Sequence, residues 1–156
     1  MIWDVNSGKA ISSYNFKSMM PDANDKSTDA SFSPDGRMAA VAFTNELTDQ
    51  SMIRVFDSEK SKLTCEAPVN SQAQLVFSKS GSSFLVIDRL GRFMRIRTAD
   101  CSEIASRELG LWQTTAWHIP LNGLTISDDR QYLYSPFNPQ SGERDDIYMY
   151  KIEDGP

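Results

Sequence analysis

Few residues of this chain belong to the types that most often carry catalysis. There is one histidine, His118, and there are two cysteines, Cys65 and Cys101. Nucleophilic catalysis needs a base within hydrogen-bond reach of an activated serine or cysteine. The strand pattern described below places Cys65 in an outer strand, Cys101 in a turn and His118 near the opposite face, so we expect no Cys–His pair. His118 is interpreted as a capping or core residue.

The other candidates for chemistry are the thiols and two acidic pairs. The cysteines make no metal-ligand spacing with the histidine and are too few for a disulfide scaffold. We expect two unrelated free thiols, and a single Cys65–Cys101 bond is the alternative. The acidic pairs 128–129 and 145–146 could bind a cation weakly, but turn-forming aspartate is the favoured interpretation. Without a phosphate-binding glycine loop or a Gly-x-Ser-x-Gly motif, the sequence predicts no catalytic residue, no metal site and no cofactor.

Composition is typical of a globular protein. Hydrophobic residues make up 40% of the 156 residues and aromatic residues 10%, which suffices for a packed core and argues against disorder. The formal net charge of −5 disfavours nucleic acid as the main partner, because phosphate binding needs a basic surface. The first residues lack the basic and apolar regions of a signal peptide, and no run of about 18 apolar residues occurs. We therefore expect a soluble cytoplasmic protein with no membrane partner.

One arrangement of residues occurs three times and reads as a strand, a tight polar turn and a second strand. The copies lie at 30–43, 75–87 and 124–134. Pro34 suits the second position of such a turn because its φ is preset, and Gly36 and Gly81 tolerate the positive φ that closes it. The corresponding residues Phe32, Phe77 and Ile126 are 45 and 49 residues apart. This spacing is close to the period of four-stranded propeller blades.

A second arrangement is a short strand that ends in an aromatic or polar residue and a turn. It occurs at 2–8, 53–59, 94–100 and 147–153. Ile53 and Val55 alternate with polar residues, as expected for a half-buried strand. A further β-prone stretch follows three of these turns, at 10–16, 63–67 and 103–109. Together the two arrangements predict four strands per repeat.

Two segments carry a resemblance to a known family. Ile2-Trp3-Asp4, followed by Asn-Ser-Gly at 6–8, is similar to the end of the third strand of a WD repeat. Phe-Ser-Pro-Asp-Gly at 32–36 is similar to the turn between the first and second strands of the same repeat. The chain thus resembles a divergent WD-repeat β-propeller over nearly its whole length. The family's Gly-His pair before the first strand is absent from the sequence, so the family's hydrogen-bonded network is not carried over.

The resemblance implies an all-β fold of β-propeller blades, each a four-stranded antiparallel sheet with strands a to d from the inner channel outward. We expect a single partial propeller domain over 1–156, with strands c and d at 1–16, blades at 28–67 and 73–109, and a partial blade at 118–153. These strands make more than three blades and fewer than four. Because propellers close with about 4 to 8 blades, the ring is expected to be incomplete. The chain is then a fragment of a longer protein, a unit that self-associates or pairs with another half-propeller, or an open arc.

Irregular sequence gathers on one face of the expected propeller. In this fold the d–a and b–c loops lie on one face and the a–b and c–d turns on the other. The long loops at 17–27, 45–51, 110–115 and 136–146 all belong to the first face. Loops on a rigid frame commonly carry binding, and Trp, Arg and Met are frequent in binding surfaces. The candidates for partner contacts are Met19, Met20, Trp112, Trp117, Phe137 and Arg144.

Two functions remain open. The favoured one is a non-enzymatic interaction scaffold of WD-repeat type that binds a protein or peptide partner through this face. The alternative is a fragment or subunit of a propeller enzyme, of the hydrolase, lactonase or cofactor-dependent dehydrogenase type, completed by further blades. An incomplete ring could not enclose the central site of such an enzyme by itself. The aromatic candidates also have a structural interpretation, because Trp112 and Trp117 could fill the gap between two blades.

If the candidate residues contact a partner, Trp112→Ala and Arg144→Ala should weaken partner capture without unfolding the protein. The physical reason is that truncated hot-spot side chains typically cost more than about 1 kcal/mol of binding. Pull-down of the partner, with circular dichroism to verify the fold, measures both effects. Unchanged capture by both variants would count against these contacts.

Overall fold

The structure, a computed structural model, describes residues 2–4, 6–12, 24–60, 62–88, 92–108, 125–127, 129, 131–135 and 148–151. The secondary structure of these residues is entirely β. The first strands are β1 (Ile2–Asp4), β2 (Lys9–Ser12), β3 (Asp25–Phe32), β4 (Met38–Asn45), β5 (Ser51–Asp57) and β6 (Lys62–Val69). The others are β7 (Ala73–Phe77), β8 (Ser83–Asp88), β9 (Arg92–Arg97), β10 (Glu103–Glu108), β11 (Thr125–Ile126), β12 (Tyr132–Ser135) and β13 (Tyr148–Lys151).

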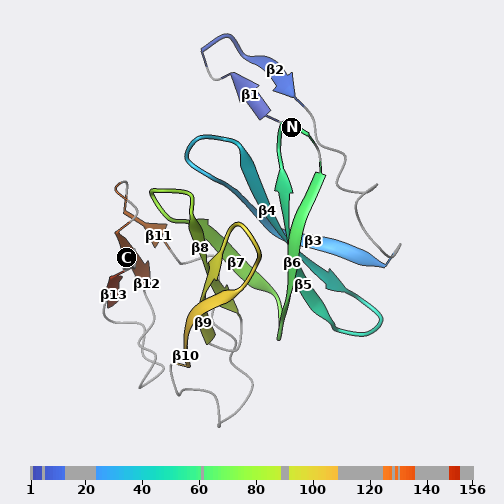
Figure 1. Ribbon diagram of the computed structural model, residues 1–156, viewed down its shortest axis with the longest axis vertical. Coiled ribbons are helices and arrows are strands. Elements are labelled where there is room, and N and C mark those ends of the chain that lie inside the picture. The colour runs from blue at the N-terminus through green and yellow to red at the C-terminus, as the bar shows by residue number, and fades with distance from the viewer. Residues whose placement is uncertain are drawn as a thin grey trace.

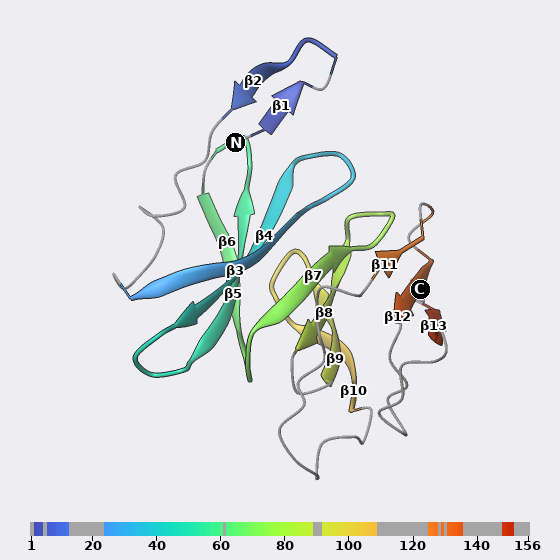
Figure 2. The ribbon, with the colours of Figure 1, turned by 180° about the vertical axis from the view of Figure 1, so that it is seen from behind.

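The strands form four antiparallel sheets in which each strand pairs with its neighbour in sequence. Two sheets have four strands, in the orders β3-β4-β5-β6 and β7-β8-β9-β10. The hairpin β1-β2 and the three-stranded sheet β11-β12-β13 lie before and after them along the chain (Figure 1). The view from behind shows the same succession of separate sheets (Figure 2). These features confirm the predicted class: all-β, with propeller blades of four-stranded antiparallel sheets in an incomplete ring.

The side chains of the β3–β6 sheet are apolar on both of its faces. In β5, Ile53 and Val55 belong to one buried cluster, whereas Phe56 belongs to another with Val41 and Phe43 of β4. Successive side chains of a strand point to opposite faces, so the two clusters lie on opposite sides of the sheet. β4 is consequently buried at every position from 39 to 44, as expected for a strand covered on both faces.

The main core lies between the two four-stranded sheets. Its residues come from β4, β5 and β6 on one side and from β7, β8 and β9 on the other. The core combines small side chains such as Ala40 and Ala42 with large ones such as Phe77 and Phe84, whose ring centroids are 5.5 Å apart. Fully burying one side chain of the larger type stabilises a fold by about 1.5–3 kcal/mol. This core therefore fixes the two blades against each other, with the inner strands β3 and β7 side by side.

The a–b turns use the same hydrogen bonds in all three copies of the repeat. The amides of Ser33, Ser78 and Ser127 donate to carbonyls five residues later, each at 2.9 Å. Gly36 and Gly81 have φ values of 73° and 74°, as the sequence predicted. Each serine hydroxyl also bonds the side chain two residues ahead. The repeat is therefore a repeat of geometry as well as of residue type.

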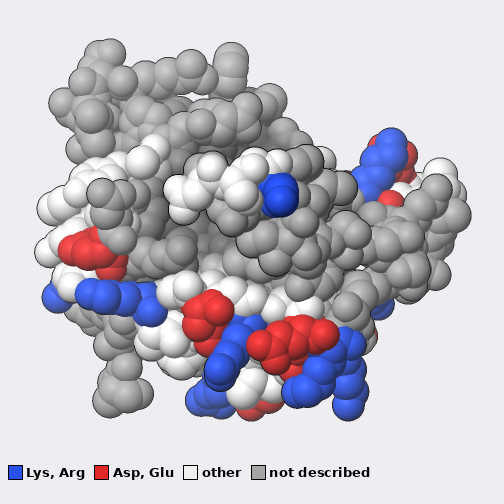
Figure 3. All heavy atoms as spheres, turned by 90° about the horizontal axis from the view of Figure 1, so that it is seen from above, with Lys and Arg blue, Asp and Glu red and all other residues white. Residues whose placement is uncertain are grey.

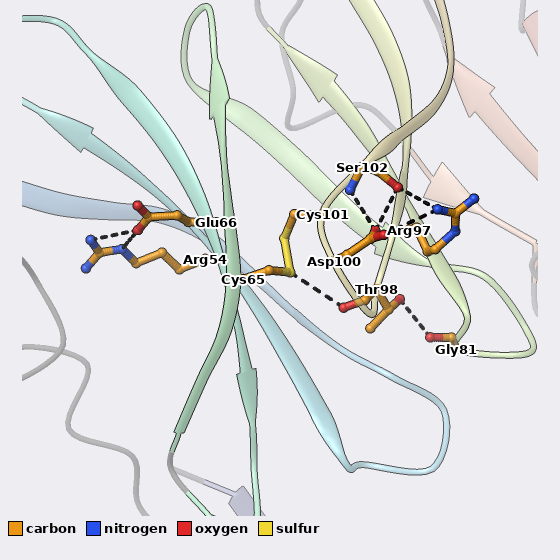
Figure 4. Close-up of a disulfide and its surroundings, with 9 residues drawn as sticks. All are labelled: Arg54, Cys65, Glu66, Gly81, Arg97, Thr98, Asp100, Cys101 and Ser102. Carbon is orange, nitrogen blue, oxygen red and sulfur yellow. Dashed lines mark hydrogen bonds and ion pairs between the residues drawn. A yellow bond between two sulfur atoms is a disulfide. The ribbon is translucent and has the colours of Figure 1, made fainter.

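The structure contradicts the expectation of two free thiols. Cys65 on β6 and Cys101 in the turn after β9 form a disulfide, with their Cα atoms 5.6 Å apart (Figure 4). Both residues lie where the sequence placed them, in an outer strand and in a c–d turn. The expectation was wrong because blade packing brings the outer strand of one blade against the c–d turn of the next. A separation of 36 residues, shorter than the repeat period, gave no sign of that contact.

Removal of this disulfide should destabilise the protein markedly. For the double variant Cys65→Ala, Cys101→Ala, we expect a loss of roughly 2–4 kcal/mol in the free energy of unfolding. The disulfide joins residues that are 36 positions apart, and so restricts the unfolded chain. Urea denaturation with and without a reductant measures the effect. The double variant, which has no cysteine left, serves as the control that should not respond to the reductant. A wild-type curve that is equally unresponsive, together with thiols that react in the native protein, would contradict the bond.

Candidate functional site

The turns and loops of the two four-stranded sheets separate onto two ends of the blades. The a–b and c–d turns lie at the upper end in the view of Figure 1, and the b–c turn of the first sheet lies at the lower end. The same separation is visible from behind (Figure 2). We call these ends the turn face and the loop face. The loop face is the one on which the sequence placed the candidate contacts.

The aspartates of the turn face accept hydrogen bonds from nearby side chains and backbone amides. These hydrogen bonds hold the pKa of each carboxyl below its usual range. The aspartates and the side-chain donors that lower each pKa most are Asp35 with Ser33, Asp57 with Lys60, Asp100 with Ser102 and Asp129 with Ser127. Asp129 thus accepts hydrogen bonds within its own turn, whereas its neighbour Asp128 lies outside the described residues. Seen from above, acidic and basic side chains lie next to each other along the edge (Figure 3).

On the loop face, the b–c turn of the first four-stranded sheet is closed by its own hydrogen bonds. The Asn45 side-chain oxygen accepts hydrogen bonds from the amides of Leu47 and Thr48, at 3.0 and 3.1 Å. The Asn45 amide donates to the carbonyl of Gln50 at 2.8 Å. Asp49 has a φ of 55°, a left-handed conformation that aspartate tolerates better than most residues. The turn holds Leu47 in solvent, with 77% of its surface exposed.

A pocket of about 440 Å³ opens beside this turn. The described residues that line it are Asp25, Phe43, Asn45, Gln50, Ser51, Met52, Arg54, Pro68 and Val69. Phe43, Met52 and Pro68 form a row across three strands, because Phe43 pairs with Met52 and Met52 pairs with Pro68. The alternate residues Ala42 and Ile53 belong to the core shared with the next blade. The apolar row therefore lies on the face of the sheet that turns away from that blade.

The polar residues of the pocket are held by specific partners. The Asn45 side-chain amide donates to Oδ1 of Asp25 at 2.9 Å. Arg54 donates from Nε and Nη2 to the same oxygen of Glu66, at 3.2 and 3.1 Å (Figure 4). The Arg54 side chain is only 12% exposed, so its charge is neutralised by a partner that lies nearer to solvent. Gln50, at the edge of the pocket, is exposed.

A carboxylate connects the inner strands of the two blades. Oδ2 of Asp29 on β3 accepts a hydrogen bond from the amide of Leu75 on β7, at 2.7 Å. β7 is the end strand of its sheet, so those of its amides that do not face β8 need a partner outside the sheet. Burial raises the pKa of Asp29, and hydrogen bonds from the amides of Leu75 and Ala30 offset part of that rise. The bond is thus made by a carboxyl that is costly to ionise in the folded protein.

The six residues predicted to contact a partner lie outside the described residues, as does His118. They are Met19, Met20, Trp112, Trp117, Phe137 and Arg144. The sequence did identify the loop at 45–51 as part of the binding face, but not the pocket beside it. One signal was available, because Leu47 is the only large apolar residue of that polar loop. Apart from Gln50, the described residues that line the pocket belong to strands, and only the pairing register brings them together.

In the described part of the chain, no group of three or more His, Cys, Asp or Glu side chains could hold a metal ion. The same residues include no helix that is long and apolar enough to cross a membrane.

Comparisons with known proteins support the fold. No protein-family model matches the sequence, and no curated protein matches it. The structure is similar to the β-propeller domain of Cps50 (Swd1) from Myceliophteria thermophila, with a TM-score of 0.55 and 11% sequence identity. The match covers 83% of this chain and 41% of that domain, so the chain spans less than half of the propeller. BamB from Moraxella catarrhalis matches with a TM-score of 0.49 and 12% identity, over 72% of this chain and 32% of that protein.

The Asp29 bond should make stability depend on pH. Because the folded pKa of Asp29 is raised above 3.8, its contribution to stability is complete below that pH and falls as pH rises through the folded pKa. Asp29→Asn keeps an acceptor for the Leu75 amide and cannot ionise, so it should remove this decline. Asp29→Ala leaves the amide without an acceptor and should cost about 1–3 kcal/mol. Urea denaturation from about pH 3 to pH 7 tests both variants, and an unchanged pH profile for Asp29→Asn would refute the assignment.

Proposed function

We propose that this chain is a non-enzymatic interaction module of WD-repeat type that binds a protein or peptide through the loop face. One observation carries the proposal: an exposed leucine on a turn closed by hydrogen bonds, directly beside an apolar pocket. An apolar side chain held in solvent by a rigid turn can contact a partner with little loss of conformational entropy. The neighbouring pocket offers the same partner a second, concave contact.

The contrast between the two faces supports this choice. The carboxylates of the turn face are committed to hydrogen bonds within their own turns, and the ion pairs there join close neighbours such as Asp57 and Lys60. Such groups would have to break existing bonds in order to bind a partner. On the loop face, most of the surface of Leu47 is already in solvent, so its side chain can bind a partner without first breaking contacts within the protein. Binding there removes apolar surface from water, which is favourable.

The disulfide bears on where the module works. The sequence favoured a cytoplasmic location, but disulfides form and persist mainly in oxidising compartments. We therefore propose that the Cys65–Cys101 bond is made in such a compartment.

We also propose that the ring is completed by further blades, of this or another chain, because the similar propeller domain is more than twice as long as the matching region.

Leu47→Ser should reduce partner capture by about fivefold or more, since a central apolar contact is typically worth more than about 1 kcal/mol. Leu63→Ser is the matched control, because Leu63 is also exposed, at 41%, but lies on an outer strand near the turn face. Affinity purification with quantitative mass spectrometry, followed by binding of the purified partner, compares the two. Equal loss in both variants, or no loss in either, would refute a role for the loop face.

A further inference from the structure

We infer that the pocket beside the Leu47 turn binds an extended peptide segment in which an apolar side chain lies next to a lysine or arginine. This inference rests on the proposed function, because it names the kind of partner that the loop face takes. It is carried by the lining of the pocket, by the charges at its edge and by the exposed amide of Gln50.

The floor of the pocket fits an apolar side chain. Phe43, Met52 and Pro68 lie in one row on this face of the sheet. A volume of about 440 Å³ is within the range of about 300–1,000 Å³ that ligand-binding sites usually have. Met52 is only half-buried and is a flexible side chain that adapts to the shape of an inserted group. The floor therefore accommodates one large aliphatic or aromatic side chain rather than a charged one.

Two carboxylates, those of Asp25 and Asp49, lie at or beside the edge of the pocket. Oδ1 of Asp25 accepts a hydrogen bond from Asn45, whereas Oδ2 has no partner within the described residues. Asp49 is exposed on the adjoining turn, and its carboxylate likewise has no hydrogen bond or ion pair with the described part of the chain. A cationic side chain that followed the apolar one could reach these carboxylates. The overall charge of −5 also favours the approach of a basic segment.

Two cations near the pocket, Arg54 and Lys26, are paired with carboxylates. Nε and Nη2 of Arg54 both donate hydrogen bonds to Oε2 of Glu66. Lys26 forms an ion pair with Glu46 at the start of the b–c turn. An anionic ligand such as a phosphate group would have to displace one of these carboxylates. The charges therefore favour a basic ligand over an acidic one.

Gln50 suits recognition of a peptide backbone. Its side-chain amide is exposed and makes no hydrogen bond within the described residues, while its carbonyl is used to close the turn. A primary amide both donates and accepts, which matches the N–H and C=O groups of an extended peptide. Because hydrogen bonds of Asn45 fix the turn, Gln50 is presented on a rigid backbone.

The test is a binding screen of the full chain against an array of nine-residue synthetic peptides. The peptides vary an apolar residue and its neighbour, which is basic, neutral or acidic. We expect the apolar–basic peptides to bind best, and their binding to weaken as salt is raised. Asp25→Asn, which keeps the acceptor for Asn45, should weaken them by roughly two- to fivefold and leave neutral peptides unchanged. Met52→Ala should weaken all bound peptides by about fivefold or more.

Two control variants match these substitutions on other surfaces. Glu59→Gln removes an exposed carboxylate from the turn face, and Leu63→Ala removes an exposed apolar side chain from an outer strand. Neither should change peptide binding. If no peptide binds, if acidic peptides bind best, or if Asp25→Asn and Met52→Ala behave like their controls, the inference is overturned.

The same variants separate this inference from the proposed function. If Leu47→Ser abolishes capture of the natural partner but Asp25→Asn and Met52→Ala do not change it, the loop face binds and the pocket assignment is wrong. If none of the three variants changes capture, both the pocket and the loop face are excluded. If all three reduce capture and the apolar–basic peptides compete with the partner, both proposals hold.

Discussion

A four-stranded sheet that is apolar on both faces cannot bury its own side chains, and this constraint determines the rest of the structure. The β3–β6 sheet has Ile53 and Val55 on one face and Phe43 and Phe56 on the other. At about 25 cal/mol per Å² of apolar surface, leaving either face in water would cost more than most single interactions could recover. The β7–β10 sheet covers one of these faces, and on the other the side chains of Val41, Phe43 and Phe56 are also buried. Blades in this chain stabilise one another rather than folding as independent units.

Three contacts secure the interface between these blades at successive distances from the inner strands. Nearest the inner edge, the Asp29 carboxylate bonds the amide of Leu75. Along the turns, Gly81 lies beside Ser33, and an added Cβ would be at van der Waals distance, 3.4 Å, from the Cβ of that serine. At the outer edge, Cys65 and Cys101 are joined covalently. Hydrophobic burial is not directional, so these specific contacts are what fix the angle and register of the two sheets.

The fold was predictable from the sequence because its signals are local. Strand alternation and turn residues such as Gly36 need only a few neighbouring residues to be recognised, and they recur at a regular period. The disulfide and the pocket were not predictable, because both depend on pairs that are distant in sequence. Met52 becomes part of a pocket only when the register places it between Phe43 and Pro68. A shift of one residue would turn it to the opposite face, and no local pattern encodes that choice.

The division between the two faces follows from where the repeat uses its signature residues. Serine, aspartate and glycine of the a–b turn, and the Ser58 and Thr98 hydroxyls that bond the neighbouring turn, all lie on the turn face. Changes there would weaken the contacts that define a blade. The b–c connection carries no residue of the repeated pattern, so its length and side chains can differ between blades without loss of the frame. An exposed leucine and an acidic pocket edge can therefore be maintained on the loop face, where they cost the fold little and remain free to contact a partner.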